Sequence, residues 1–182
     1  GEAIVGPLKG TFLEEVTSQQ MSLLSWIDQH PNTLILQPDT FFTKSYDELA
    51  KFDEGTIDSG LEKRDSLSWQ EKSWVVGIQQ GASSKTYDWN DLVRLRIIND
   101  FVNEVPVLLT LESDSVSFHA WNRDTLDFVL TDNVLRDQQT SSTWNWRGQC
   151  TEGKLEGAQL KFVQAYQEFW HSWKTFHPAT SQ

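Results

Sequence analysis

An internal repeat constrains the fold of this chain more than any other feature of its sequence. Residues 1–33 align without a gap to residues 148–180, and 12 of the 33 aligned positions are identical. Average residue usage would leave about two identities by chance. In the first segment the identical positions are Gly1, Gly6, Leu8, Gly10, Leu13, Val16, Gln20, Ser25, Trp26, His30, Pro31 and Thr33. The offset of 147 residues is far longer than the roughly 20–50 residues of a solenoid unit, so the repeat predicts a tandem duplicated domain.

The repeat also predicts the domain organisation. We expect residues 1–37 to be the C-terminal tail of a first repeat copy, truncated at its N-terminus, and residues 73–182 to be a second copy. Residues 38–72 carry Pro, Gly and a charged stretch without a hydrophobic period, and are expected to form an irregular connector. Because the chain starts without Met and inside a repeat, we expect a fragment of a longer protein. The missing first copy is expected to pack against this chain.

Two repeat-related helices are predicted near the ends of the chain. A capping-box pattern, T-S-Q-Q, begins at Thr17, and the helix is expected to end at His30 and the proline after it. Its counterpart is expected to begin near Gln164, because aromatic residues follow at steps of three and four. His30 and His177 precede proline at equivalent positions, so we assign both to a cap or turn.

The middle of the chain predicts a sheet. The runs W-V-V-G-I, V-P-V-L-L-T-L, S-V-S-F-H-A-W and L-D-F-V-L-T have strand length and are separated by Gly, Asn and Asp turns. In residues 115–121 apolar and polar residues alternate, which predicts a strand with one solvated face. A further helix is predicted within residues 89–101, with Asn90 as its cap. The predicted fold class is therefore α+β, mainly an antiparallel sheet with short flanking helices.

Composition excludes several classes of function. The 26 acidic and 15 basic residues give a net charge of -11, which repels phosphate backbones, so we exclude nucleic acid as a partner. No apolar run approaches the roughly 20 residues that cross a bilayer, so no transmembrane segment is predicted. The single cysteine, Cys150, excludes an internal disulfide framework and is assigned to packing, where the first repeat copy has Ala3.

Few side chains in this sequence offer catalytic chemistry. His119 lies on the polar face of its predicted strand and is a candidate general base. Two acidic pairs are candidates for acid and base, although carboxylate clusters on an acidic surface are usually solvated. These pairs are Glu112 with Asp114 and Asp124 with Asp127. The histidines are scattered and no serine lies in a G-x-S-x-G turn, so we assign neither a catalytic residue nor a metal ligand.

Tryptophan is abundant, with nine in 182 residues. Trp26 and Trp173 are equivalent in the repeat and are assigned to the core. Trp144 and Trp146 alternate at strand spacing, so one of them is expected to face a cleft, where an indole offers a platform for a sugar or an aromatic ligand.

Several motifs, in order along the chain, closely resemble a prokaryotic domain-of-unknown-function family, the one numbered 3179. They begin with G-E-A-I-V-G-P-L-K-G-T-F-L and W-x3-H-P-N-T-L-I-L in the first segment. They continue with V-V-G-I at Val75, K-T-Y, I-I-N-D at Ile97, V-P-V-L-L-T at Val105 and D-x2-T-x-S-x-W at Asp137. The resemblance covers most of the chain. It implies an extracytoplasmic protein that carries the unit twice and has no established activity.

The family's better-kept copy carries a Tyr, His, Glu and Cys set that suits nucleophilic or metal chemistry. This chain departs from that set. Leu95 and Arg96 stand where the resemblance implies His and Glu, and Leu111 and Glu112 stand where it implies Tyr and Cys. The copy in this chain is therefore predicted to lack the reactive residues.

We predict a non-catalytic binding or structural module, whose cofactor is unknown and whose ligand is a small molecule or a protein. The candidate ligand-binding residues are Tyr87, Asn99, Asp100, Arg123, Asp137 and Trp144. The alternative is that this chain is part of an enzyme or of a metal or redox protein, whose reactive Cys and His lie in the missing first copy.

Overall fold

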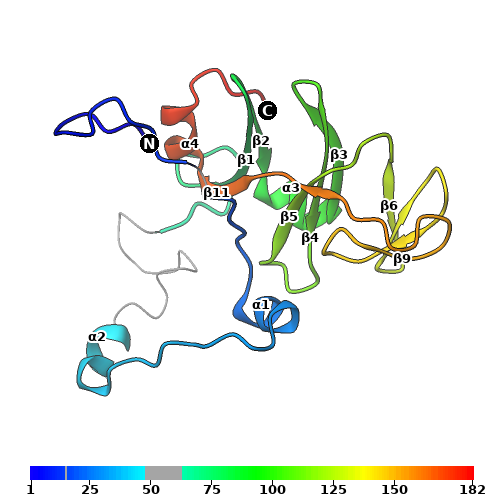
Figure 1. The fold of residues 1–182 in the computed structure, drawn as a ribbon, viewed down its shortest axis with the longest axis horizontal. Helices are drawn as coiled ribbons and strands as arrows, with labels where there is room; N and C mark the ends of the chain where they lie inside the picture. Colours follow the sequence, from blue (N-terminus) through cyan, green and yellow to red (C-terminus); the bar gives the residue numbers. More distant parts are fainter. Residues whose placement is uncertain (15, 48–62) are drawn as a thin grey trace.

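The computed structural model describes residues 1–14, 16–47 and 63–182, and its body consists of three antiparallel sheets side by side (Figure 1). In the first sheet β11 (Ala165–Phe169), β1 (Trp74–Gln80) and β2 (Ser83–Asp88) pair in that order. In the second the order is β10 (Lys161–Phe162), β5 (Phe118–Asn122), β4 (Val105–Leu111) and β3 (Ile97–Val102). In the third it is β6 (Phe128–Thr131), β7 (Val134–Asp137), β8 (Thr143–Trp144) and β9 (Cys150–Glu152). The antiparallel α+β class predicted from the sequence is confirmed.

The helices are short and lie around the sheets. They are α1 (Leu23–Gln29), α2 (Thr43–Asp47), α3 (Trp89–Leu95) and α4 (Trp170–Phe176), with a 3₁₀ turn, η1, at Thr40–Phe42. Among the described residues, no helix has the length and apolar character needed to cross a membrane. Part of the predicted connector, residues 48–62, lies outside the described residues.

The middle sheet is covered on both faces, and this explains the uninterrupted apolar run of β4. Val107, Leu109 and Leu111 lie in a core shared with the first sheet and α3. Leu108, between them in sequence, lies in a second core shared with the third sheet. Successive side chains of a strand point to opposite faces, so a strand buried on both faces has no polar alternation. The solvated face predicted for residues 115–121 is therefore wrong: β5 begins at Phe118, and its first four residues are buried.

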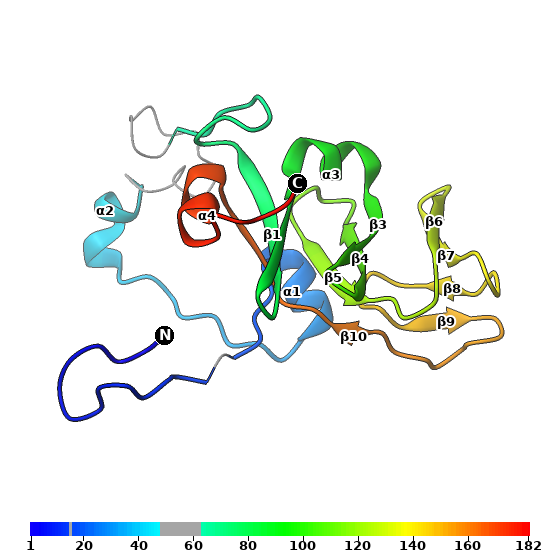
Figure 2. The ribbon, with the colours of Figure 1, turned by 90° about the horizontal axis from the view of Figure 1, so that it is seen from above.

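The last part of the chain crosses all three sheets (Figure 2). Residues 148–180, which we call the C-terminal repeat segment, supply β9 to the third sheet, β10 to the second and β11 to the first. The segment ends in α4, whose Trp173 is 1% exposed. A Cβ atom on Gly77 of β1 would lie 2.4 Å from the Trp173 ring, so only glycine permits this approach.

Both repeat-related helices are shorter than predicted. α1 begins at Leu23 with Ser22 as its N-cap, whose Oγ accepts from the Ser25 amide at 3.1 Å, and the predicted start at Thr17 is wrong. The helix predicted from Gln164 begins only at Trp170, because the residues before it pair with β1 as an edge strand. Pairing with a strand distant in sequence overrides the local helical spacing.

The helix predicted within residues 89–101 ends at Leu95, and its cap is Asp88 instead of Asn90. An Oδ atom of Asp88 accepts from the Asp91 amide at 3.2 Å. Arg96 then adopts a left-handed φ of 69°, which terminates the helix, and the following residues pair with β4 as β3.

α1 is attached to the body through polar contacts on one side. The Ser22 amide donates to Ser117 Oγ at 2.9 Å, and Ser22 Oγ donates to Asp114 Oδ2 at 2.8 Å. Burial alone would raise the pKa of Asp114, but hydrogen bonds donated by Ser117, Val116 and Ser22 outweigh it and lower the pKa to about 2. The charged form of Asp114 therefore favours the attached position of α1.

We predict that α1 loosens in acid. The folded-state pKa of Asp114 lies below its ordinary value, so its contribution is complete above about pH 4 and is lost as the pH falls towards about 2. Hydrogen-exchange protection of α1, corrected for intrinsic rates, should fall across this window in the natural chain. Asp114→Asn should show low protection already at pH 7, whereas Asp132→Asn, at an exposed turn, should behave as the natural chain does. Protection in Asp114→Asn equal to that of the natural chain would contradict the assignment.

Candidate functional site

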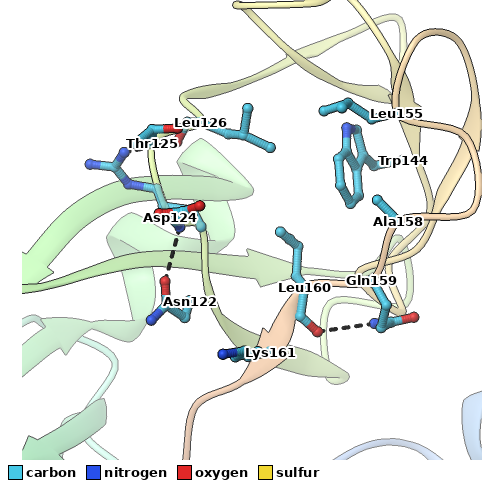
Figure 3. A pocket seen from close by; sticks show the side chains of 11 residues that line it. Asn122, Asp124, Thr125, Leu126, Trp144, Leu155, Ala158, Gln159, Leu160 and Lys161 are labelled. Carbon is cyan, nitrogen blue, oxygen red and sulfur yellow. Dashed lines mark hydrogen bonds between the residues drawn. The ribbon is translucent and has the colours of Figure 1, made fainter.

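A cavity opens where the second and third sheets meet (Figure 3). It has a volume of about 480 Å³, within the range of small-molecule sites. Eleven residues line it: Asn122, Arg123, Asp124, Thr125, Leu126, Trp144, Leu155, Ala158, Gln159, Leu160 and Lys161. We call it the Trp144 cavity. Its walls come from the end of β5 and the loop that follows it, from β8, and from the C-terminal repeat segment.

One side of the cavity is apolar. Figure 3 shows Trp144 between Leu155 and Ala158, with the side chain of Leu126 reaching towards them from the opposite wall. Leu160 lies at the base between the two walls. The indole itself belongs to the second core, where it meets Phe128 edge to face with ring centres 5.5 Å apart. The apolar wall is thus a rigid extension of the core.

The other side of the cavity is polar. The loop after β5 is held by Asn122, whose Oδ1 accepts from the Asp124 amide at 2.9 Å. Lys161 is exposed at the rim. Arg123 is buried and its guanidinium is already engaged: Nη1 donates to the Leu126 carbonyl at 2.8 Å and lies 2.9 Å from an Asp127 carboxylate oxygen. The rim therefore offers amide, carboxylate and ammonium groups, while Arg123 shapes the loop.

Asp137 fixes the orientation of Trp144 from behind. Trp144 Nε1 donates to Asp137 Oδ2 at 2.9 Å, and Thr140 donates to both carboxylate oxygens, through its amide at 2.6 Å and its hydroxyl at 2.9 Å. Asp137 is 1% exposed. Burial alone would raise the pKa of Asp137, but the hydrogen bonds from Trp144 and Thr140 prevail and lower it. The carboxylate is thus a charged structural partner of the indole.

The structure brings together only some of the residues predicted to bind a ligand. Arg123 and Trp144 line the cavity, and Asp137 supports Trp144 from outside the lining. Asn99 lies elsewhere: its side-chain amide donates to the Phe128 carbonyl and its Oδ1 accepts from the Phe128 amide, each at 2.8 Å. Asn99 therefore joins β3 to β6.

Tyr87 and Asp100 form a separate cluster with Lys85, away from the cavity. Lys85 Nζ lies 2.6 Å from Asp100 Oδ2. Burial raises the pKa of Asp100, but the hydrogen bond and charge of Lys85 act against it and the net pKa is lowered. Burial, followed by the negative charge of Asp100, raises the pKa of Tyr87. The three side chains lie between β2 and β3, which are edge strands of the first and the second sheet.

A second cleft, of about 690 Å³, lies between α1, the turn after β4 and the residues after β8. Glu112 lies at its base and accepts from Ser25 Oγ at 3.0 Å. His119 Nε2 is 2.6 Å from the same Glu112 oxygen, and the ring is buried with Nδ1 lacking a hydrogen-bond partner. The prediction that His119 lies on a solvated face is therefore wrong. Trp146, and not Trp144, lines this cleft.

The order of these three groups does not suit nucleophilic catalysis. A serine nucleophile needs its hydroxyl to donate to the imidazole that removes the proton, with the carboxylate behind the ring. In this chain the carboxylate of Glu112 lies between Ser25 and His119. The arrangement attaches α1 to the body. Among the described residues no group of three or more His, Cys, Asp or Glu side chains is placed to hold a metal ion.

The positions at which the family resemblance implies reactive residues lie close together. The Leu111 amide donates to the Arg96 carbonyl at 2.8 Å, so positions 95–96 and 111–112 meet across the end of α3 and β4. In this chain they carry Leu95, Arg96, Leu111 and Glu112. These neighbouring positions therefore carry neither Cys nor His in this chain.

Sequence reasoning missed the apolar wall of the cavity. Leu155 and Leu160 are identical to their counterparts in residues 1–33, and this identity predicts a structural role. It does not predict that both leucines line a cavity with Trp144. Leu126 and Ala158 carry no pattern of their own. Cys150 is buried in the second core, as the packing assignment expected.

We predict that Asp137→Ala destabilises the chain by about 3 kcal/mol, because it leaves the buried Trp144 N–H without its acceptor. Urea unfolding at pH 7 measures this loss, with Glu104→Ala as a matched control at an exposed turn. Because the pKa of Asp137 is lowered in the folded state, its stabilisation holds above the ordinary carboxyl range and is lost as the pH falls below it. A loss under about 1 kcal/mol would show that the Asp137–Trp144 bond is dispensable.

A comparison with protein-family models gives a match over residues 1–180 to the family described as Protein of unknown function (DUF3179). This match confirms the family resemblance seen in the sequence. Searches of the curated proteins and of the solved structures gave no match.

Proposed function

Because the chain belongs to the family of proteins of unknown function DUF3179, whose description assigns no activity, we propose a function from the geometry. The chain is a non-catalytic binding module that holds a small molecule in the Trp144 cavity. The observation that carries this proposal is the pairing of a rigid apolar wall with a polar rim across about 480 Å³. Such a combination is typical of ligand sites, where apolar contacts supply affinity and a few polar groups fix orientation.

The lining favours a ligand with a ring-shaped apolar face and polar edges. The Trp144 wall suits the apolar face, while Asn122 and Lys161 are amide and ammonium donors for hydroxyl or carbonyl oxygens. Asp124 is an acceptor for hydroxyl groups. A neutral monosaccharide or disaccharide has this chemistry and this size. The non-catalytic role is supported by Leu95, Arg96, Leu111 and Glu112, which replace the reactive set.

We predict that neutral sugars bind in the Trp144 cavity. The test is saturation-transfer NMR with a panel of monosaccharides and disaccharides on the natural chain and on Ala158→Phe, whose added ring fills the cavity. Thr151→Phe, on the exposed side of β9, is the matched control. Transfer should be seen with the natural chain and the control and be lost in Ala158→Phe. No transfer from any sugar, or equal transfer in Ala158→Phe, overturns the proposal.

We also propose that the chain comes from a duplicated extracytoplasmic protein. The duplication is supported by the identities between the two repeat segments, and the location rests on the family resemblance. Fractionation of cells that produce the natural protein tests the location, because recovery in the cytosolic fraction alone would contradict it. The alternative, that a first copy carries reactive Cys and His and this chain supplies one wall of an enzyme, stays a hypothesis.

A further inference from the structure

The two repeat segments share a helix near their end and a β-bridge near their start. Residues 1–33, the N-terminal repeat segment, contain α1, and its equivalent in the C-terminal repeat segment is α4, at an offset of 147 residues at both ends. Trp26 Nε1 donates to Thr33 Oγ1 at 2.8 Å, and Trp173 Nε1 donates to Thr180 Oγ1 at 3.0 Å. The β-bridge between residues 2 and 12 recurs between residues 149 and 159.

The surroundings of the two segments differ completely. The C-terminal repeat segment is buried against three sheets, whereas the apolar residues of the N-terminal repeat segment are exposed. Three identical pairs show this contrast in exposed fraction: Leu13 78% and Leu160 8%, Val16 85% and Val163 5%, Trp26 38% and Trp173 1%. Exposed apolar surface of this extent on one segment is typical of an interaction site.

The glycines shared by the two repeat segments show the same contrast between a packed and an open environment. A Cβ atom on Gly148 would lie 2.9 Å from the Trp121 ring, and one on Gly153 would lie 2.8 Å from Ser142. Close approach therefore constrains both positions to glycine in the C-terminal repeat segment. Their counterparts in the N-terminal repeat segment are also glycines, but a Cβ atom on either would meet nothing within 4 Å. The φ of 87° at Gly6 favours glycine by itself, whereas Gly1 leaves room for a neighbour of the kind that Trp121 provides to Gly148.

One side of α1 contacts the three-sheet body, so only the opposite side is available to a partner. Ser22 and Ser25 contact the turn after β4, and the Gln167 amide donates to Gln20 Oε1 at 2.7 Å. The Trp26 ring lies against His30, with ring centres 4.0 Å apart and a tilt of 38°, and Trp26 lines two open clefts. A partner can reach Trp26 without displacing the contacts of Ser22 and Ser25.

We propose that the N-terminal repeat segment docks on a second sheet unit of this same fold, in the way that the C-terminal repeat segment docks on residues 74–144. The occupant is a copy of the three-sheet body, with a glycine of β1 under Trp26 and apolar residues over Leu13 and Val16. α1 then lies between two bodies, with its serines on one and its tryptophan on the other. This inference rests on the proposed duplication and is independent of the Trp144 cavity.

The test gives the N-terminal repeat segment a body with a vacant docking site, because in this chain residues 148–180 already occupy the site on residues 74–144. In a fusion that places a second copy of residues 34–147 ahead of residue 1, residues 1–33 follow that copy as residues 148–180 follow the first. Hydrogen-exchange protection of α1 should rise at least tenfold in the fusion over the natural chain. Trp26→Ala in the fusion should remove this rise, whereas Lys9→Ala, at an exposed position, should keep it.

Near-UV circular dichroism first checks that the original copy keeps its folded signal in the fusion. Protection of α1 equal to that in the natural chain overturns the proposal, because the segment would then leave a vacant body unbound. A rise in protection that Trp26→Ala leaves unchanged also overturns it, because the contact would then use another surface. The assay contains no sugar, so its outcome is separate from that of the cavity experiment.

Discussion

The arrangement of the three sheets depends on the C-terminal repeat segment, and the contact of Trp173 with Gly77 anchors the end of this segment to the body. Apart from that segment, each sheet is built from strands adjacent in sequence: β1 with β2, β3 to β5, and β6 to β8. The C-terminal repeat segment alone supplies an edge strand to all three sheets. Truncating a buried tryptophan to alanine costs about 3–5 kcal/mol, so this anchor is a large part of the stability of an ordinary domain. Local hairpins form the sheets, and a long-range segment fixes their order.

The difference between local hairpins and the long-range C-terminal repeat segment explains which parts of the fold could be predicted from the sequence. The antiparallel α+β class followed from strand-length runs in the middle of the chain, because a run such as that of β4 depends on its own residues. Residues 165–169 were misassigned to the helix that begins only at Trp170, since their aromatic spacing is helical and only the pairing with β1, about 90 residues away, makes them a strand. The end of α3 was also missed, because Arg96 carries no sequence signal for a left-handed φ.

The candidate site was predictable only in part, for a related reason. Arg123 and Trp144 were selected by residue type, and they line one cavity because the loop after β5 and β8 converge there. Asn99 and Asp137 were equally polar in the sequence, yet the fold uses their side chains to satisfy the Phe128 backbone and the Trp144 indole. Buried polar groups are normally paired, so a polar residue in a strand is as often structural as functional. Only its hydrogen-bond partners in the folded structure distinguish the structural role from the functional one.

The repeat links the cavity to the proposed docking of the N-terminal repeat segment. Leu155 and Leu160, from the C-terminal repeat segment, form part of the cavity wall, and their equivalents are Leu8 and Leu13. A segment that crosses three sheets therefore both fixes their order and completes the apolar wall of the Trp144 cavity. If the N-terminal repeat segment docks on a second body in the same way, Leu8 and Leu13 complete an equivalent cavity there. The rim of that cavity would then come from the second body, and the N-terminal repeat segment would supply only its apolar wall.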